Sequence, residues 1–320
     1  MSVKQTVSVI IPTYNRADLI PRAINSLLGQ THRPDQIIVV DDASTDNTSE
    51  VLASYAQDIL AIKHPANHGL AAARNTGIQN VSCDVIALLD SDDTLLPTSI
   101  EKRLSILEAR PDISVVYSDV WLVDEHGTRL ARYTEVEPRP RPSGNVFDEF
   151  VLYNLMPVHG FMFRRMCLNK VGDFDVRLRR HQGVEDYDFW LRMASHFQFQ
   201  YLDEPLAYYY IHSTMMTKMD EAGMQKGWLE VHRRIFDMAA FHALTPSQKS
   251  RAFSAHGTRC AEVGEIRDAR SWYWRALAAK PYSARPYLLL LLTLFGQSGF
   301  NWVVRGFHRL RRGTAQKLFG

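Results

Sequence analysis

The sequence Val7-Ser-Val-Ile-Ile-Pro-Thr-Tyr-Asn-Arg16 joins a short apolar run to a cluster of polar residues. β-Branched residues dominate the run and a proline ends it, which is typical of a buried strand. Four further segments have the same apolar character: 36–40, 59–63, 84–89 and 113–117. Segments with helical features separate these strands: 18–28, 44–57, 70–79 and 97–109. The alternation predicts a Rossmann-like α/β fold, with a mostly parallel sheet flanked by helices.

Polar residues cluster where three of the predicted strands end. They are residues 13–16, the pair Asp41-Asp42, and the run Asp90-Ser-Asp-Asp93. Ligands of parallel α/β sheets bind beyond the carboxyl ends of the strands. We therefore expect these three clusters to form one site.

The run Asp90-Ser-Asp-Asp93 brings three carboxylates together within four residues. Carboxylates that are so close repel one another unless a cation neutralises them. Ligand sets made of oxygen atoms suit Mg²⁺ or Mn²⁺, which also bind substrate phosphates. The alternative is a solvated acidic turn whose aspartates cap a helix. The position after a buried strand, level with two other polar strand ends, favours the metal.

Two other segments of this region have open interpretations. In Asp41-Asp42, a carboxylate can accept a hydrogen bond from a nucleotide base or a ribose, or it can cap the helix that follows Ser44. Arg74 lies in a predicted helix of small residues, 69–77. It can bind a diphosphate, or it can form a structural ion pair with one of the aspartates.

A second acidic centre is Glu185-Asp186, which precedes an apolar helical segment. A carboxylate at a helix N-terminus stays ionised, which suits a general base for an acceptor hydroxyl. Ordinary enrichment of acids in a first helical turn is the alternative. His212, and with less support His159, offers an imidazole to a metal, although packed or surface histidines are common.

The order of these segments resembles that of glycosyltransferase family 2. The matching segments are 7–16, 39–46, 69–77, 88–93 and 185–186, and the resemblance covers about residues 5 to 217. It implies a GT-A fold, a nucleotide-sugar donor, a divalent metal and inversion at the sugar carbon.

The resemblance also implies roles for individual residues. The implied donor-binding residues are Pro12, Thr13, Tyr14, Asn15, Arg16, Asp41, Asp42, Arg74, Asp90 and Ser91. The implied metal ligands are Asp90, Asp92, Asp93 and His212, with Asp92 as the direct ligand. Asp186 matches the catalytic base and Glu185 the neighbour that supports it. Ala43 stands where the family usually has glycine, so we expect that turn to have no positive φ.

The C-terminal region differs in character from the rest of the chain. We expect a catalytic domain over 1–222 and a helical region over 223–320. Beyond Asp268 the sequence has nine basic residues and no acidic one. Basic residues alternate with aromatic ones over 302–312, which suits an anionic membrane surface; a buried helix pair with a solvated basic end is the alternative. The apolar run 287–295 is too short to span a bilayer.

The expected function is transfer of a sugar, with UDP as the commonest donor nucleotide of the family. The acceptor would be a carbohydrate or a lipid-linked sugar in cell-surface polysaccharide or glycolipid synthesis, and no nucleic acid partner is expected. Three cysteines without pair spacing and no signal peptide predict a cytoplasmic protein. The basic C-terminus would make it peripheral on the inner face of the cell membrane.

Two other functions compete with this interpretation. A nucleotidyltransferase that forms nucleotide sugars shares the sheet topology and the metal, but it usually has a Gly-rich basic loop where this chain has residues 12–16. A non-catalytic nucleotide-sugar-binding protein is the other alternative. The presence of all the expected acids argues against it.

Overall fold

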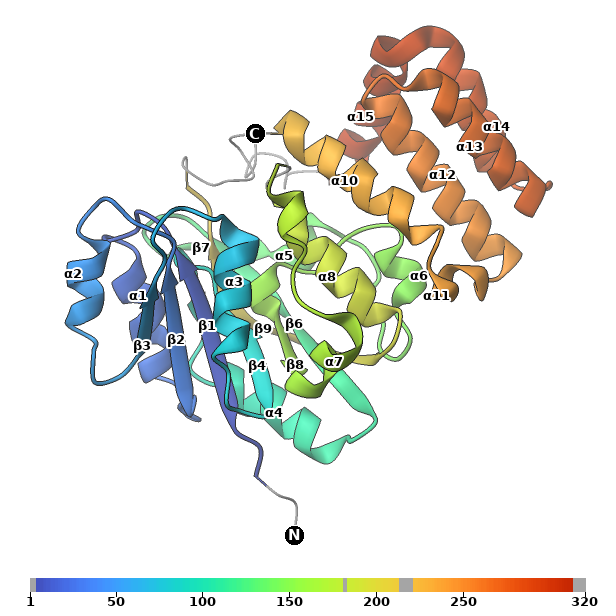
Figure 1. Cartoon of the computed structure of the whole chain (residues 1–320). Helices are drawn as coiled ribbons and strands as arrows, with labels where there is room; N and C mark the ends of the chain where they lie inside the picture. Colours follow the sequence, from blue (N-terminus) through green and yellow to red (C-terminus); the bar gives the residue numbers. More distant parts are fainter. Residues whose placement is uncertain (1–3, 181–182, 213–220, 313–320) are drawn as a thin grey trace.

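A nine-stranded sheet is the centre of the computed structural model (Figure 1). The structure describes residues 4–180, 183–212 and 221–312, without the side chains of 179–180, 221–222, 305 and 307–312. The strand order is β3-β2-β1-β4-β8-β6-β9-β5, with β7 paired to β6. The strands are β1 (Val7–Thr13), β2 (Gln36–Asp41), β3 (Leu60–Lys63), β4 (Val85–Leu88), β5 (Thr94–Leu95), β6 (Ile113–Val123), β7 (Arg129–Arg132), β8 (Phe161–Arg164) and β9 (Gln198–Tyr210).

The predicted α/β fold is confirmed, but the sheet is mixed rather than mostly parallel. Strands β3, β2, β1 and β4 are parallel, as predicted. Strand β8 then pairs antiparallel with both β4 and β6, and β9 pairs parallel with β6 and antiparallel with β5. An apolar run indicates a strand but not its direction, so the sequence could not reveal this change.

Helices cover both faces of the sheet. In α1 the buried residues are Ile20, Ala23, Ile24 and Leu27, which is the spacing of a helix with one apolar face. In α8, Trp190 is fully buried and its ring stacks on Phe161 of β8 at 4.1 Å. The helices of this part are α1 (Ile20–Leu28), α2 (Thr48–Ala53), α3 (Leu70–Gln79), α4 (Ser99–Ala109), α5 (Tyr133–Val136), α6 (Phe147–Phe150), η1 (Val158–Gly160), η2 (Arg165–Cys167), α7 (Leu168–Val171), η3 (Val176–Arg180) and α8 (Glu185–Ala194).

Helix α3 approaches the sheet closely, because its sheet-facing residues are small. A Cβ atom added at Gly77 would lie 2.3 Å from Ile10 Cγ2 of β1. Ala71 and Ala73 are buried in the same interface. The close approach brings the buried Arg74 to the end of the sheet where the polar clusters lie.

Beyond β9 the described chain is entirely helical. The helices are α10 (Glu221–Ile235), α11 (Ala239–His242), α12 (Pro246–Glu262), α13 (Ile266–Ala279), α14 (Ala284–Leu292), η4 (Thr293–Phe295) and α15 (Gly296–Arg312). Val231, Ile235 and Phe241 belong to the same apolar core as the sheet, while Tyr273 and Phe300 belong to a smaller second core. The first helices of this region are therefore packed on the α/β part.

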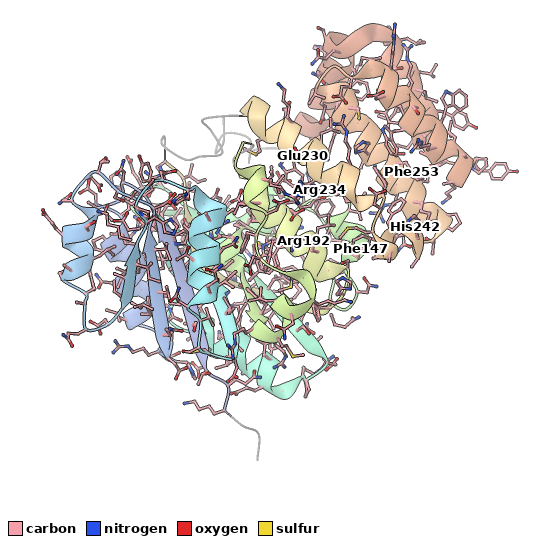
Figure 2. The ribbon with its side chains drawn as sticks, in the orientation of Figure 1. Phe147, Arg192, Glu230, Arg234, His242 and Phe253 are labelled. Carbon is pink, nitrogen blue, oxygen red and sulfur yellow. The ribbon has the colours of Figure 1, made fainter. Side chains whose placement is uncertain are left out.

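Ion pairs reinforce the junction between α8 and α10. Arg234 of α10 contacts Asp188 of α8 at 3.4 Å and Asp175 at 2.6 Å, and it also pairs with Glu230. Arg192 of α8 pairs with Asp188 at 2.9 Å. Figure 2 shows the labelled side chains of Arg192, Glu230 and Arg234 at this junction.

The last helices contain a longer apolar stretch than the sequence indicated. Ala284–Val304 has the length and composition of a membrane-spanning helix; an 18-residue window within it has a mean hydropathy of 1.4, and only 17% of that window is buried. The apolar run 287–295, which we expected to be too short to span a bilayer, is therefore part of a longer apolar stretch. However, Gly296 has φ +66°, so the stretch is divided between α14 with η4 and α15.

Candidate active site

The ends of β1 and β2 lie side by side, as predicted. Thr13 is paired with Asp41, and the Asp42 amide donates to the Thr13 carbonyl at 2.9 Å. Asn15 follows in the left-handed region, with φ +52°. The Asn15 amide donates to Ser44 Oγ at 2.9 Å, so the two polar loops are fastened together. Pro12 and Thr13 are buried in this corner, and Tyr14 is exposed.

Both carboxylates of the pair Asp41-Asp42 are buried and have partners within the protein. Asp41 accepts from the Ser44 amide at 2.8 Å and from Ser49 Oγ at 2.9 Å. Asp42 accepts from the Gly69 amide at 2.7 Å and contacts His64 Nδ1 at 2.7 Å. The pair therefore shapes the loops before α2 and α3.

The turn after Asp42 contradicts the expectation for Ala43. Ala43 has φ +66°, so the turn needs the left-handed conformation although no glycine is present. The reason is the hydrogen bond from the Ser44 amide to the Asp41 carboxylate, which holds the chain reversed at this point. An alanine in this conformation costs about 1–2 kcal/mol.

Asp92 lies between the loop after β1 and His212, two residues beyond the end of β9. Its Oδ2 is 3.2 Å from His212 Nε2 and 3.8 Å from Arg16 Nη2. Arg22 of α1 donates to the Asp92 carbonyl at 2.7 Å. Burial alone would raise the pKa of Asp92, but the His212 hydrogen bond and the Arg16 charge hold this pKa below its ordinary value. Three segments that are distant in the sequence thus meet at one carboxylate.

Asp93 pairs with the second histidine, His159. Its Oδ2 is 3.0 Å from His159 Nδ1, and its Oδ1 accepts from the Tyr210 amide at 2.9 Å. Both side chains are buried. Burial raises the pKa of Asp93 to about 6, although His159 opposes the change. Burial also acts to lower the pKa of His159, but the neighbouring carboxylates, Asp93 first, outweigh it and raise this pKa.

The acids and histidines of this region offer ligand atoms that suit a hard divalent cation. Ligand atoms of Asp90, Asp93 and His159 all lie within 4.8 Å of one another. Asp92 with His212 offers a second carboxylate–imidazole pair, and its side chains are 23% and 13% exposed. Carboxylate oxygen and imidazole nitrogen are both ligands that Mn²⁺ accepts, and the carboxylates also suit Mg²⁺.

Arg74 joins the two acidic centres. Its Nη2 donates to Asp90 Oδ1 and its Nη1 donates to Glu185 Oε1, each at 2.8 Å, and the side chain is 2% exposed. Burial alone would lower the pKa of Arg74, but Asp90 and Glu185 outweigh it and raise this pKa. The structural ion pair left open by the sequence is therefore present. Asp90 and Glu185 therefore both contact the guanidinium of Arg74.

Asp186 occupies the first turn of α8, beside this ion pair. Asn154 Nδ2 donates to Asp186 Oδ2 at 3.2 Å, and the Tyr187 amide lies 2.6 Å from Oδ1. Burial raises the pKa of Asp186 to about 7, with the Glu185 charge as the next cause and Arg74 opposing both. The helix N-terminus therefore does not keep this carboxylate fully ionised, contrary to the expectation from the sequence, because burial outweighs it. A carboxylate with this pKa can take and release a proton near neutral pH.

The sequence did not reveal several residues that support this site. Arg22 is one of them, and its guanidinium lies 3.3 Å from the centre of the Tyr210 ring. Asn154 and His64 are the others, and each contacts a predicted site aspartate. No local pattern marks these residues, because each partner comes from a different part of the chain.

The C-terminal helices reach the loop that carries Asn154. Arg259 of α12 donates to the Leu152 carbonyl at 3.0 Å and to His232 Nε2 at 2.9 Å. Tyr187, the residue after Asp186, donates to the Phe150 carbonyl at 2.7 Å. Burial lowers the pKa of His232 well below its ordinary value, so this imidazole is neutral and accepts from Arg259. The helical region thus contributes to the wall beside Asp186.

Known proteins resemble this chain in sequence and in fold. An uncharacterised glycosyltransferase of Methanocaldococcus jannaschii is 32% identical over 217 residues, which are 65% of this chain and 71% of the relative. The structure of TarS from S. aureus matches with a TM-score of 0.63 and 17% identity, over 88% of this chain and 54% of TarS. The mannosyltransferase PcManGT from Pyrobaculum calidifontis matches with a TM-score of 0.57 and 15% identity, over 97% of this chain and 86% of that protein.

The two structural likenesses establish the fold, which is the GT-A fold. The model of the family described as glycosyl transferase family 2 matches residues 8–172, which is more than half of the chain. This range contains the ends of β1, β2 and β4 and therefore Asp41, Asp42 and the acids from Asp90 to Asp93. The chain belongs to glycosyl transferase family 2.

Proposed function

We propose that this glycosyltransferase moves a sugar from a nucleoside diphosphate donor to a hydroxyl acceptor, with inversion at the anomeric carbon. The observation that carries the proposal is the bridge from Asp90 through Arg74 to Glu185. It brings the predicted metal-binding acids and the predicted base to the same part of the molecule. Such nearness supports the proposal, because inversion needs the metal and the base to act on one sugar, with the acceptor attacking from the side opposite the leaving diphosphate.

UDP is the proposed nucleotide of the donor. TarS has been solved with UDP-GlcNAc and PcManGT with GDP-Man and Mn²⁺, which supports a sugar nucleotide as the ligand of this fold. The proposed nucleotide pocket is the corner between the β1 and β2 ends, with the residues from Pro12 to Arg16 on one side and Asp41 and Asp42 on the other. Arg16 would connect this corner to Asp92, which it contacts at 3.8 Å.

The proposed cofactor is Mn²⁺ or Mg²⁺, held by Asp92, Asp90 and His212, with Asp93 behind them. Asp92 and His212 are partly exposed and already adjacent, whereas Asp93 and His159 are enclosed and paired with each other. A cation bound there would stabilise the negative charge that develops on the leaving diphosphate. Replacing His212 by alanine should weaken Mn²⁺ binding in a titration more than the same change at His159. The reverse order would assign the cation to Asp90, Asp93 and His159.

Asp186 is the proposed base that takes the proton from the acceptor hydroxyl. Its pKa of about 7 suits the task, since a base works best when its pKa lies near the working pH. Asn154 would orient the carboxylate through its hydrogen bond to Oδ2. Glu185, which is held by Arg74, would help to keep the pKa of Asp186 high.

We further propose a carbohydrate or lipid-linked acceptor, a cytoplasmic location and attachment to the inner face of the cell membrane. The basic side chains predicted to contact the membrane, Arg305, Arg309, Arg311, Arg312 and Lys317, lie outside the described side chains. No nucleic acid partner is proposed, because the positive charge of this region is not accompanied by a nucleic-acid-binding motif.

The roles of Asp186 and Asp92 can be tested separately. Asp186→Asn should abolish transfer and retain donor binding, because the amide keeps the shape of the side chain but takes no proton. Asp92→Ala should weaken Mn²⁺-dependent donor binding, measured by calorimetry with UDP-sugars. Asp237→Asn, at an exposed position, is the matched control and should change neither property. Transfer at the wild-type rate by Asp186→Asn would disprove the base assignment.

A donor-cleavage assay separates the competing functions. A glycosyltransferase should slowly release free nucleotide from its donor in a metal-dependent way when no acceptor is present. A nucleotidyltransferase would instead join a sugar phosphate to a nucleoside triphosphate, and it would release pyrophosphate from the triphosphate. A binding protein would release neither product.

A further inference from the structure

The outer face of α14 and η4 is apolar and exposed. Its residues are Tyr287, Leu288, Leu291, Leu294 and Phe295, which are 48%, 51%, 59%, 69% and 71% exposed. They are two adjacent pairs and Leu291, with three or four residues between successive turns, which places them on one side of the helix. We call this set the α14 face. Figure 1 shows α14 at the end of the molecule that lies away from the sheet.

The opposite side of the same helix is packed in the protein. Pro286 and Leu289 of α14 are buried, and Leu289 belongs to the small core that contains Tyr273 and Phe300. The inner side therefore explains why the helix is held in place, but it does not explain the α14 face. Soluble proteins rarely expose a contiguous apolar patch of this kind unless it binds something.

The charge of the C-terminal sequence and two exposed aromatic residues favour lipid as the binding partner of the α14 face. Residues 269–320 have nine basic residues and no acidic one, which complements an anionic surface. Helices that contact α14 add Trp274 and Trp302, which are 62% and 80% exposed. Aromatic residues of this type are enriched at membrane–water interfaces, where one end of the ring is apolar and the other is wet.

The backbone decides between lying on a bilayer and crossing it. The stretch Ala284–Val304 is long and apolar enough to cross. However, the positive φ of Gly296 separates η4 from α15, and Phe300 of α15 is fully buried in the small core. Crossing would require this core to open. If the helix lies on the membrane surface, the α14 face can contact lipid without any change in the small core.

We propose that the α14 face inserts into the headgroup region of an anionic lipid bilayer and attaches the enzyme to the membrane surface. This inference gives a defined surface to the membrane attachment proposed above. It is independent of the transfer reaction, because binding can be measured without donor or acceptor.

The test is co-sedimentation of the full chain with vesicles. One set of vesicles contains phosphatidylglycerol and phosphatidylcholine in equal parts, and the other contains phosphatidylcholine alone. The variant is Leu291→Gln/Leu294→Gln, since glutamine keeps the helix propensity while it removes the apolar surface. The matched control is Leu60→Gln/Met166→Gln, which changes two exposed apolar residues, 43% and 65% exposed, on the α/β part. Deleting α15 is avoided because it would remove Phe300 from the core.

The expected result is that the wild type and the control pellet with anionic vesicles, and that the variant binds at least about tenfold more weakly. Binding to the neutral vesicles should be several-fold weaker, because the basic residues then have no charged lipid to contact. Equal thermal unfolding midpoints for variant and control would exclude a folding defect. Equal vesicle binding by variant and wild type would overturn the proposal. So would a wild type that does not bind vesicles but forms a dimer that the variant loses, since the α14 face would then contact a second copy.

Discussion

Replacing Asp186 by asparagine should stabilise the folded protein at alkaline pH. The physical reason is that the native environment disfavours the ionised carboxylate: burial and Glu185 raise its pKa from 3.8 to about 7. The native protein therefore binds this proton more tightly than the unfolded chain does. A group of this type adds stability that is complete below the unfolded pKa and is lost as the pH rises through the folded pKa.

The size of the effect follows from the pKa difference. Each pKa unit corresponds to about 1.4 kcal/mol, so a difference of about three units would cost the wild type about 4 kcal/mol when Asp186 is ionised. The side chain is partly accessible to solvent, which reduces this value to about 2–3 kcal/mol. Asparagine cannot ionise, so the folded variant does not lose this stability as the pH rises. Part of this cost is already present at pH 5, which lies above the unfolded pKa. The gain in stability of Asp186→Asn over the wild type should therefore grow by about 1 kcal/mol between about pH 5 and about pH 8.

Urea denaturation of both proteins at the two pH values measures this difference directly. Other titrating groups are common to both proteins and largely cancel. Asp237→Asn is again the control, and the free energy difference between this variant and the wild type should not depend on pH in this range. If the gain of Asp186→Asn is the same at both pH values, the raised pKa of Asp186 is refuted, whatever the variant does to catalysis.

Four further substitutions test other parts of the structure by urea denaturation. Arg74→Met should cost about 3–5 kcal/mol, because it leaves the buried Glu185 and the partly buried Asp90 without their cation, and a smaller loss would show that solvent compensates these carboxylates. Gly77→Ala should cost about 1–3 kcal/mol, since the new methyl group would collide with Ile10. Ala43→Gly should stabilise by about 0.5–1 kcal/mol by relieving the positive φ, and a loss of stability would contradict this explanation. Arg259→Met should cost about 1–3 kcal/mol and lower kcat, because the Leu152 carbonyl loses its donor; an unchanged kcat would show that the helical region does not position the site.

The local pattern of the chain contained most of the first half of the fold. Strands β1 and β4 could be predicted from the apolar composition of each run and from the residue that ends it. The reason is that a strand buried on both faces has little choice of side chain. The periodicity of α1 was equally direct. Strand direction was not readable, since the same residues suit either direction, and β8 accordingly changed the expected parallel sheet into a mixed one.

The pairing of the site residues was only partly readable from the chain. The sequence placed the acids at strand ends, and the rule that ligands bind there was enough to expect one site. It left two roles open for Arg74, and only the tertiary structure showed the ion pairs with Asp90 and Glu185. It also gave the wrong conformation for Ala43, because that φ is imposed by a hydrogen bond rather than by the residue itself.

By itself, the sequence determined the family, the strand-and-helix order and the residue types that carry the chemistry. These properties depend on neighbours along the chain and on residues that recur in a defined order. The tertiary structure decided which histidine faces which aspartate, how Arg74 connects the acidic centres and which side of α14 remains uncovered. Such contacts depend on distances between residues far apart in the chain, and local patterns of spacing and polarity contain no information about those distances.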